Sequence, residues 1–113
     1  MKGIKIHKLD DMKGGWFVGD FCPSVLRSTD FEVGYKQYLK GQRDERHYHK
    51  IATEITVIVR GRAIICDKEL EQGDIITIQA GVVSGFEALT DVDLIVVKFP
   101  SVPNDKYIHA IDA

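Results

Sequence analysis

One stretch of the sequence decides the fold: residues 41–61 read GQRDERHYHKIATEITVIVRG. It holds two histidines, His47 and His49, which are followed after four intervening residues by Glu54. In a β-strand, residues i and i+2 share a face and lie about 6 to 7 Å apart, so both imidazoles can reach one ion at about 2 Å each. The four residues before Glu54 allow a chain reversal that returns its carboxylate to the same point. This pattern predicts a divalent-metal site made by His47, His49 and Glu54.

Two imidazoles and one carboxylate hold one side of a metal ion and leave the other positions open for substrate or dioxygen. Such a site suits iron(II), manganese, nickel or zinc, and the sequence does not choose among these divalent transition metals. A plainer interpretation is also open. In it, His47 and His49 lie at the surface on a polar strand end, and Glu54 is a solvated charge.

The rest of the chain has the pattern of an all-β domain. Short β-branched or aromatic segments alternate with turns rich in Gly and Asp, and no segment shows a sustained helical period. The expected strands span residues 4–9, 16–21, 31–39, 54–59, 63–66, 75–78, 83–89 and 94–99. A turn is expected at residues 67 and 68. Closing antiparallel sheets into a jelly roll removes exposed strand edges, so we predict a jelly-roll barrel.

The faces of three strands carry further information. In residues 31–39, alternation sorts the side chains into two faces, one for the core and one for water. Residues 55–59 and 94–97 are instead apolar on both faces. That pattern is typical of strands covered on the outside by another sheet or by a partner subunit. We therefore expect a homodimer.

Composition and charge limit the partners. The chain has 113 residues, 44% hydrophobic and 28% charged, as in ordinary folded domains, and we expect one domain over residues 1–113. A net charge of -2 with dispersed Lys and Arg argues against nucleic-acid binding. No apolar run approaches the roughly 18 residues that cross a bilayer, and the start MKGIKIHKLDD is too polar for a signal peptide. We expect a cytoplasmic protein with no membrane partner.

The stretch 41–61 resembles, spacing for spacing, the first motif of the cupin superfamily, G-x5-H-x-H-x4-E-x6-G. Its fixed positions are occupied by Gly41, His47, His49, Glu54 and Gly61. The resemblance covers about residues 30–100, with N-terminal strands before residue 30 and an extended tail over residues 100–113. It implies a small single-domain, RmlC-like cupin whose jelly-roll barrel is a double-stranded β-helix.

The second cupin motif, G-x5-P-x-G-x2-H-x3-N, is matched only in part, by residues 73–88. Gln79 replaces its proline, Ala88 its asparagine, and Ser84 the histidine that serves cupins as fourth metal ligand. Three outcomes follow: a three-ligand site completed by water, a replacement ligand from elsewhere, or a barrel that holds no metal. The candidate replacements are Glu87, Cys66, His7 and His109, and alternation sets Glu87 on the face opposite Ser84.

The resemblance leaves two functions open. The first is a metal-dependent enzyme, an oxygenase or an isomerase or lyase, acting on a small polar metabolite such as a sugar or keto acid. The second is a non-catalytic barrel that binds or senses a sugar or nucleotide sugar, with metal absent or structural. Basic residues near the motif either meet an anionic substrate at the barrel mouth or are solvated rim charges. These residues are Arg43, Arg46, Arg60 and Lys36.

Overall fold

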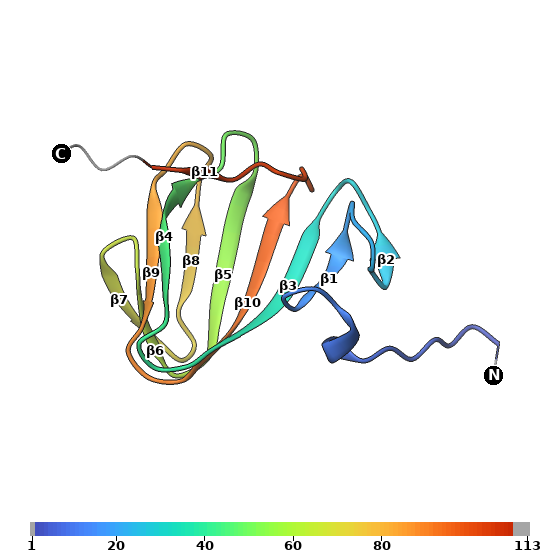
Figure 1. Ribbon diagram of the computed structural model, residues 1–113, viewed down its shortest axis with the longest axis horizontal. Helices are drawn as coiled ribbons and strands as arrows, with labels where there is room; N and C mark the ends of the chain where they lie inside the picture. The colour runs from blue at the N-terminus through green and yellow to red at the C-terminus, as the bar shows by residue number, and fades with distance from the viewer. Residues whose placement is uncertain (1, 110–113) are drawn as a thin grey trace.

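The computed structural model describes residues 2–109, which form eleven strands and one short 3-10 helix (Figure 1). The elements are η1 (Leu9–Asp11), β1 (Trp16–Gly19), β2 (Leu26–Arg27), β3 (Glu32–Tyr38), β4 (Arg43–Tyr48), β5 (Thr53–Arg60), β6 (Arg62–Ile65), β7 (Lys68–Glu71), β8 (Ile75–Ile78), β9 (Ser84–Ala88), β10 (Val92–Phe99) and β11 (Tyr107–Ile108). None of the helices in this described range is long and apolar enough to span a membrane.

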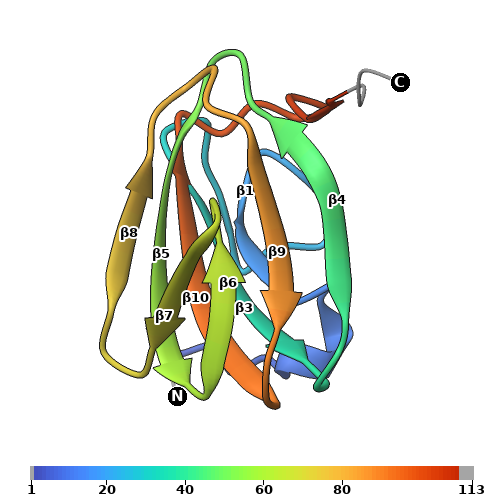
Figure 2. The ribbon, with the colours of Figure 1, turned by 90° about the vertical axis from the view of Figure 1, so that its left-hand side faces the viewer.

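The strands form two sheets that face each other. One sheet has the order β2-β1-β3-β10-β5-β8 and the other β11-β4-β9-β6-β7. Figure 2 shows the two layers, with β8, β5 and β10 in one and β6, β9 and β4 in the other. Neighbouring strands that are far apart in sequence, such as β3 and β10, make this a jelly roll, so the predicted all-β fold class is confirmed.

The core fills one end of the space between the sheets. Its largest fully buried side chains are Ile58 on β5 and Val92 on β10. The cluster comprises Ile58, Ala63, Ile65, Ile78, Ala88, Val92, Leu94 and Val96. Ile65, Leu94 and Val96 also line a cavity at the other end, so the core forms the apolar floor of that cavity.

The inner face of β3 is the more polar of its two faces. Glu32 is 8% exposed, and Lys36 and Tyr38 line the cavity. Val33 and Tyr35 alternate with them and point outward, paired in register with β10. Alternation therefore identified the two faces of this strand, and the face that enters the barrel interior carries charge.

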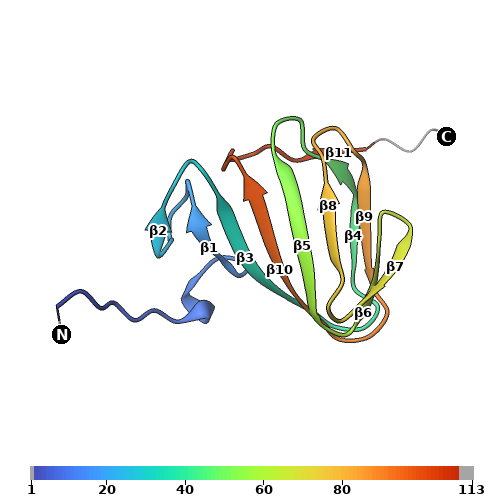
Figure 3. The ribbon, with the colours of Figure 1, turned by 180° about the vertical axis from the view of Figure 1, so that it is seen from behind.

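Figure 3 shows the strands of the six-stranded sheet from behind. The register pairs place an apolar surface on the outer face of this sheet, across β3, β10, β5 and β8. Val57 pairs in register with Ile95 on one side and with Ile75 on the other, and Ile55 pairs with Val97. Ile75 is 66% exposed. Within residues 2–109 no second sheet covers this face.

Two local expectations are wrong. Residues 4–9 form no strand, because the segment before η1 runs away from both sheets (Figure 1) and meets no strand edge of its own chain with which to pair. Its Ile6 is 87% exposed. The turn expected at residues 67 and 68 lies one residue earlier, since positive φ at Cys66 and Asp67 lets β7 begin at Lys68 and pair with β6.

An outward-facing carboxylate links three neighbouring strands. Asp93 on β10 accepts a hydrogen bond of 2.7 Å from the Tyr35 hydroxyl on β3 and one of 3.1 Å from the Arg60 guanidinium on β5. The Tyr35 bond, with the help of Arg60 and against the effect of burial, holds the pKa of Asp93 below its ordinary value.

The variant Asp93→Asn is expected to lower the free energy of unfolding at pH 7 by about 1 to 2 kcal/mol, since two charge-assisted bonds are weakened. Because the folded-state pKa is depressed, the carboxylate stabilises the fold above its unfolded-state pKa, and this contribution is lost as pH falls through the folded-state pKa. Urea unfolding should therefore show the gap between variant and parent shrinking from about pH 4 downward. A gap that stays constant to pH 2, or one equal to that of Asp10→Asn in the exposed N-terminal region, would contradict this.

Candidate functional site

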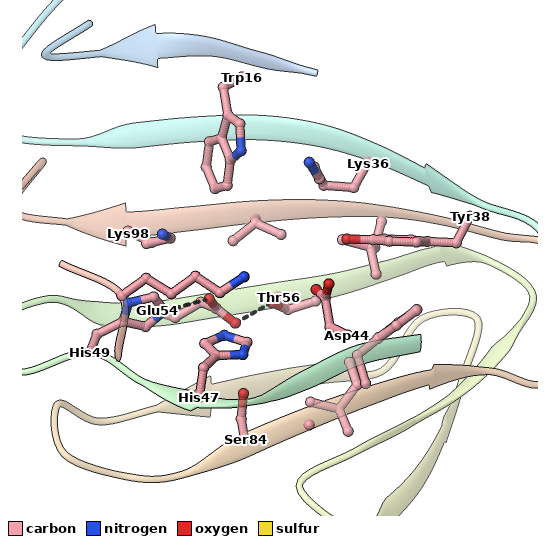
Figure 4. A pocket seen from close by; sticks show the side chains of 16 residues that line it. Trp16, Lys36, Tyr38, Asp44, His47, His49, Glu54, Thr56, Ser84 and Lys98 are labelled. Atoms are coloured by element: carbon pink, nitrogen blue, oxygen red, sulfur yellow. Dashed lines mark hydrogen bonds and ion pairs between the residues drawn. The ribbon is translucent and has the colours of Figure 1, made fainter. Parts of the chain in front are cut away.

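A cavity of about 350 Å³ opens between the two sheets above the core (Figure 4). One wall comes from β3, β10 and β5, and the other from β4 and β9. The polar and charged side chains that line it are Lys36, Tyr38, Asp44, His47, His49, Glu54, Thr56, Ser84, Lys98 and Lys106. The three predicted donors, His47, His49 and Glu54, are among them, so the structure brings them to one place.

Both histidines enter the cavity from the end of β4. His47 is 9% exposed and His49 6%, with ring centroids 5.3 Å apart. His47 Nδ1 contacts the carbonyl oxygen of Glu45 at 2.8 Å, and His49 Nδ1 contacts the carbonyl oxygen of Asp105. A carbonyl oxygen only accepts, so in each ring Nδ1 carries a hydrogen and Nε2 is the nitrogen left to bind another group. Metal-binding histidines are held by this same outer bond to a carbonyl.

Glu54, near the start of β5, faces His49. Its Oε1 lies 3.5 Å from His49 Nε2, and its Oε2 accepts a hydrogen bond of 3.2 Å from the Thr56 hydroxyl. Burial alone would raise the pKa of Glu54, but the His49 imidazole, the Lys98 ammonium and Thr56 outweigh it and hold the pKa below its ordinary value. Burial also lowers the pKa of His47, which favours the neutral imidazole. A carboxylate at Glu54 and a neutral imidazole at His47 are the forms that bind metals.

His49 Nε2 is the decisive atom. It is buried, and within residues 2–109 it has no hydrogen-bond partner. This nitrogen and a carboxylate oxygen therefore face each other away from water, and a proton or a metal cation between the two atoms would stabilise the pair. This fits a divalent ion. The three side chains share the cavity without forming a complete ligand set. In the described range, no three His, Cys, Asp or Glu side chains are placed so that they could hold one metal ion.

A serine occupies the fourth ligand position of the second sequence motif. Ser84 on β9 pairs in register with His47 and is 7% exposed. Glu87 points away and forms an ion pair of 3.2 Å with Arg43. None of the replacement ligands weighed from the sequence reaches the cavity; in the described residues its lining excludes Glu87, Cys66, His7 and His109.

Asp105 holds the loop between β4 and β5, and sequence reasoning missed it. Its backbone carbonyl accepts a hydrogen bond from His49. Its carboxylate accepts hydrogen bonds of 2.9, 3.1 and 2.9 Å from the backbone N–H groups of Lys50, Ile51 and Ala52. Burial alone would raise the pKa of Asp105, but these three bonds hold it below its ordinary value. The only sign of it in the sequence is the pair Asn104-Asp105, which is typical of turns, and Asn104 does adopt a turn conformation with φ 65°.

Asp44 and Tyr38 are two further cavity residues that the sequence did not single out. Strict alternation would set Asp44 opposite His47, but a β-bulge between them inserts one residue, so both enter the cavity. Burial, with a contribution from the Asp44 carboxylate, raises the pKa of Tyr38 to about 12, so its hydroxyl stays protonated. Figure 4 shows the Tyr38 hydroxyl and the Asp44 carboxylate directed into the same space as Glu54.

No family model matches the sequence, and neither does any curated protein. Solved structures do match. A conserved protein with a double-stranded β-helix domain from Klebsiella pneumoniae is 19% identical, with 94% of this chain and 92% of that chain covered and a TM-score of 0.69. A sugar phosphate isomerase of the cupin superfamily from Silicibacter pomeroyi is 22% identical, with 74% and 59% covered and a TM-score of 0.65. Oxalate decarboxylase from Bacillus subtilis, which has Mn(II) centres, is 19% identical, with 72% and 24% covered and a TM-score of 0.63.

Proposed function

We propose that this chain, which has the cupin fold of those structures, is a metal-dependent enzyme acting on a small polar metabolite. The observation that carries the proposal is the buried, unpartnered His49 Nε2 facing the Glu54 carboxylate. With His47, these residues would hold one iron(II), manganese, nickel or zinc ion. The likeness to a sugar phosphate isomerase and to a Mn(II)-containing decarboxylase supports isomerase or lyase chemistry.

The other cavity residues would provide proton transfer and orientation. A bound divalent ion supplies Lewis-acid polarisation of a substrate oxygen. The Asp44 carboxylate is the group that would accept a substrate proton, since Glu54 is committed to the ion. The protonated Tyr38 hydroxyl would donate a hydrogen bond to substrate oxygen. The apolar floor of Leu94 and Val96 keeps bulk water from that side.

Calorimetric titration of the metal-free protein tests the proposal. Mn(II), Fe(II) under anaerobic conditions, Ni(II) and Zn(II) are each titrated, and at least one should bind at one site per chain in competition with the others. A protein that binds none of the four at this stoichiometry would refute the proposal. It would favour the alternative of a non-catalytic binding barrel, which Ser84 in place of a fourth imidazole already supports.

We further propose that the chain is a homodimer held through the outer face of the six-stranded sheet. A contiguous apolar surface across four strands is unusual on a monomer and typical of an interface. A second copy is the cover that this face fits, because its apolar residues run from β8 to β3 and no second sheet of the described chain packs on them.

The variant Val57→Lys places a charge at the centre of this surface and is expected to convert the dimer into monomer. Light scattering coupled to size exclusion measures the mass, and Gln72→Lys, in the exposed turn between β7 and β8, is the control for a charge outside this surface. A parent protein that is monomeric at 100 µM, on the order of concentrations used in such experiments, would contradict the proposal, as would a Val57→Lys dimer.

A further inference from the structure

Three lysines meet in the cavity wall. Lys36 on β3 and Lys98 on β10 lie on the inner faces of adjacent strands, and Lys106 enters from the segment before β11. The Lys98 side chain is only 17% exposed. Withdrawing an ammonium group from water is costly unless an anion compensates it, so lysines on an inner strand face require an explanation.

The protein itself compensates these charges poorly. Lys98 has one ion pair, with Glu32 at 3.8 Å, and Lys36 donates to the carbonyl oxygen of Gly14 at 2.6 Å. Within residues 2–109 no carboxylate lies within ion-pair distance of Lys36 or Lys106. Burial lowers the pKa of Lys36, and repulsion by Lys106 and Lys98 lowers it further, against an opposing effect of Asp44.

Trp16 fixes where two of the ammonium groups lie. Its indole rests on Gly34, where an added Cβ would come within 2.8 Å of the ring. The Lys36 and Lys98 ammonium nitrogens lie 5.5 and 5.0 Å from the ring centroid, within the range of cation–π attraction (Figure 4). The two charges are thus held in place in the wall formed by β3, β10 and β5, where Lys98 is the register neighbour of Glu54, while the two histidines enter from β4 in the other sheet.

The arginines near the motif are already engaged elsewhere. Arg43 pairs with Glu87 at 3.2 Å, Arg46 with Asp67 at 3.2 Å, and Arg60 with Asp93 at 3.1 Å. None of these three lines the cavity. Of the basic residues noted in the sequence as possible anion contacts, Lys36 alone has its side chain at the site.

We propose that the cavity binds a small organic anion, whose carboxylate or phosphate group is held by the ammonium groups of Lys36, Lys98 and Lys106. The inference rests on the proposed function, because it has the rest of the molecule reach the proposed metal site at His47, His49 and Glu54. A volume of about 350 Å³ is at the small end of ligand sites and suits a sugar acid, a sugar phosphate or a keto acid. Two fixed positive charges favour such an anion over a neutral sugar of similar size, because they form charge-assisted hydrogen bonds with its acidic group.

Calorimetry on the metal-loaded protein with three matched probes tests this inference. D-Glucuronate and D-glucose 6-phosphate carry the two possible anionic groups, and D-glucose is the neutral control. At least one anion should bind at least tenfold more tightly than glucose. The anion that binds more tightly shows whether the lysines hold a carboxylate or a phosphate group. Lys98→Gln and Lys36→Gln should each weaken that binding by about 10-fold to 100-fold, while Lys68→Gln on the exposed strand β7 leaves it unchanged. Equal binding of glucose, no binding of either anion, or lysine variants that bind like the parent would overturn the inference.

Metal content measured in the same samples separates this inference from the proposed function. Full metal loading with no preference for anions refutes the lysine site alone and leaves the metal proposal standing. Anion binding that depends on the lysines, in a parent protein that takes up no metal, refutes the metal proposal and supports the anion site as that of a binding barrel. Lys36→Gln is the variant whose metal content should match the parent's, since Lys36 contacts Gly14 and Trp16 rather than the three donors.

Discussion

The variant His49→Ala is expected to lose metal binding altogether while the barrel stays folded. His49 supplies the buried Nε2 that faces Glu54 at 3.5 Å, and its removal leaves two donors, His47 and Glu54, on opposite walls. Two donors hold a divalent ion far more weakly than three. Titration with Mn(II) or Zn(II) should therefore show no one-site isotherm.

The control for this variant is His109→Ala. His109 is exposed and follows β11, outside the cavity, so its loss should leave binding at the parent's level. Circular dichroism on both variants confirms that the β-structure is kept. Retention of one tightly bound metal in His49→Ala, or equal loss in His109→Ala, would show that the metal is held elsewhere.

The second large effect is expected from Asp105→Ala, which removes one buried carboxylate that binds three backbone N–H groups. Each hydrogen bond to a charged group is worth about 1.5 to 3 kcal/mol, and the combined loss is expected to be about 3 kcal/mol or more. The loop between β4 and β5 then no longer fixes His49. Metal affinity should fall by about 10-fold to 100-fold, as when outer partners of metal ligands are removed.

Urea unfolding and metal titration measure the two consequences of the Asp105 substitution separately. Asp105→Asn keeps one acceptor oxygen and should fall between the parent and the alanine variant in both. Asp10→Ala, in the exposed η1, is the matched control and should change neither. An Asp105→Ala protein as stable as the parent would mean that the loop is held by other contacts.

The sequence predicted the fold class and the placing of His47, His49 and Glu54 in one site because both depend on local patterns. Spacing alone places His47 and His49 on one strand face, and Gly61, with φ 90° and no room for a Cβ beside Thr90 and Asp91, has a conformation that only glycine readily adopts. Alternation likewise identified Glu87 as pointing away from Ser84.

What the sequence did not predict depends on long-range contacts or on irregularities. Asp105 meets the loop at residues 50–52 across more than fifty positions, and no local pattern reports such a pairing. Asp44 enters the cavity only because of a β-bulge, which reverses its face. Lys36 lies on an inner strand face, contrary to the usual placement of charge, and such departures are expected where a site is built.

The most direct test of the central claim is the metal content of the protein purified without a metal-binding tag. Elemental analysis is made on the parent, on His47→Ala and on Glu54→Ala, before and after reconstitution with iron(II), manganese, nickel and zinc. Near one metal per parent chain, lost in both variants, is the expected result, and the identity of the ion then narrows the reaction. A parent chain that holds no metal in any preparation would contradict the claim and leave a small-molecule binding barrel.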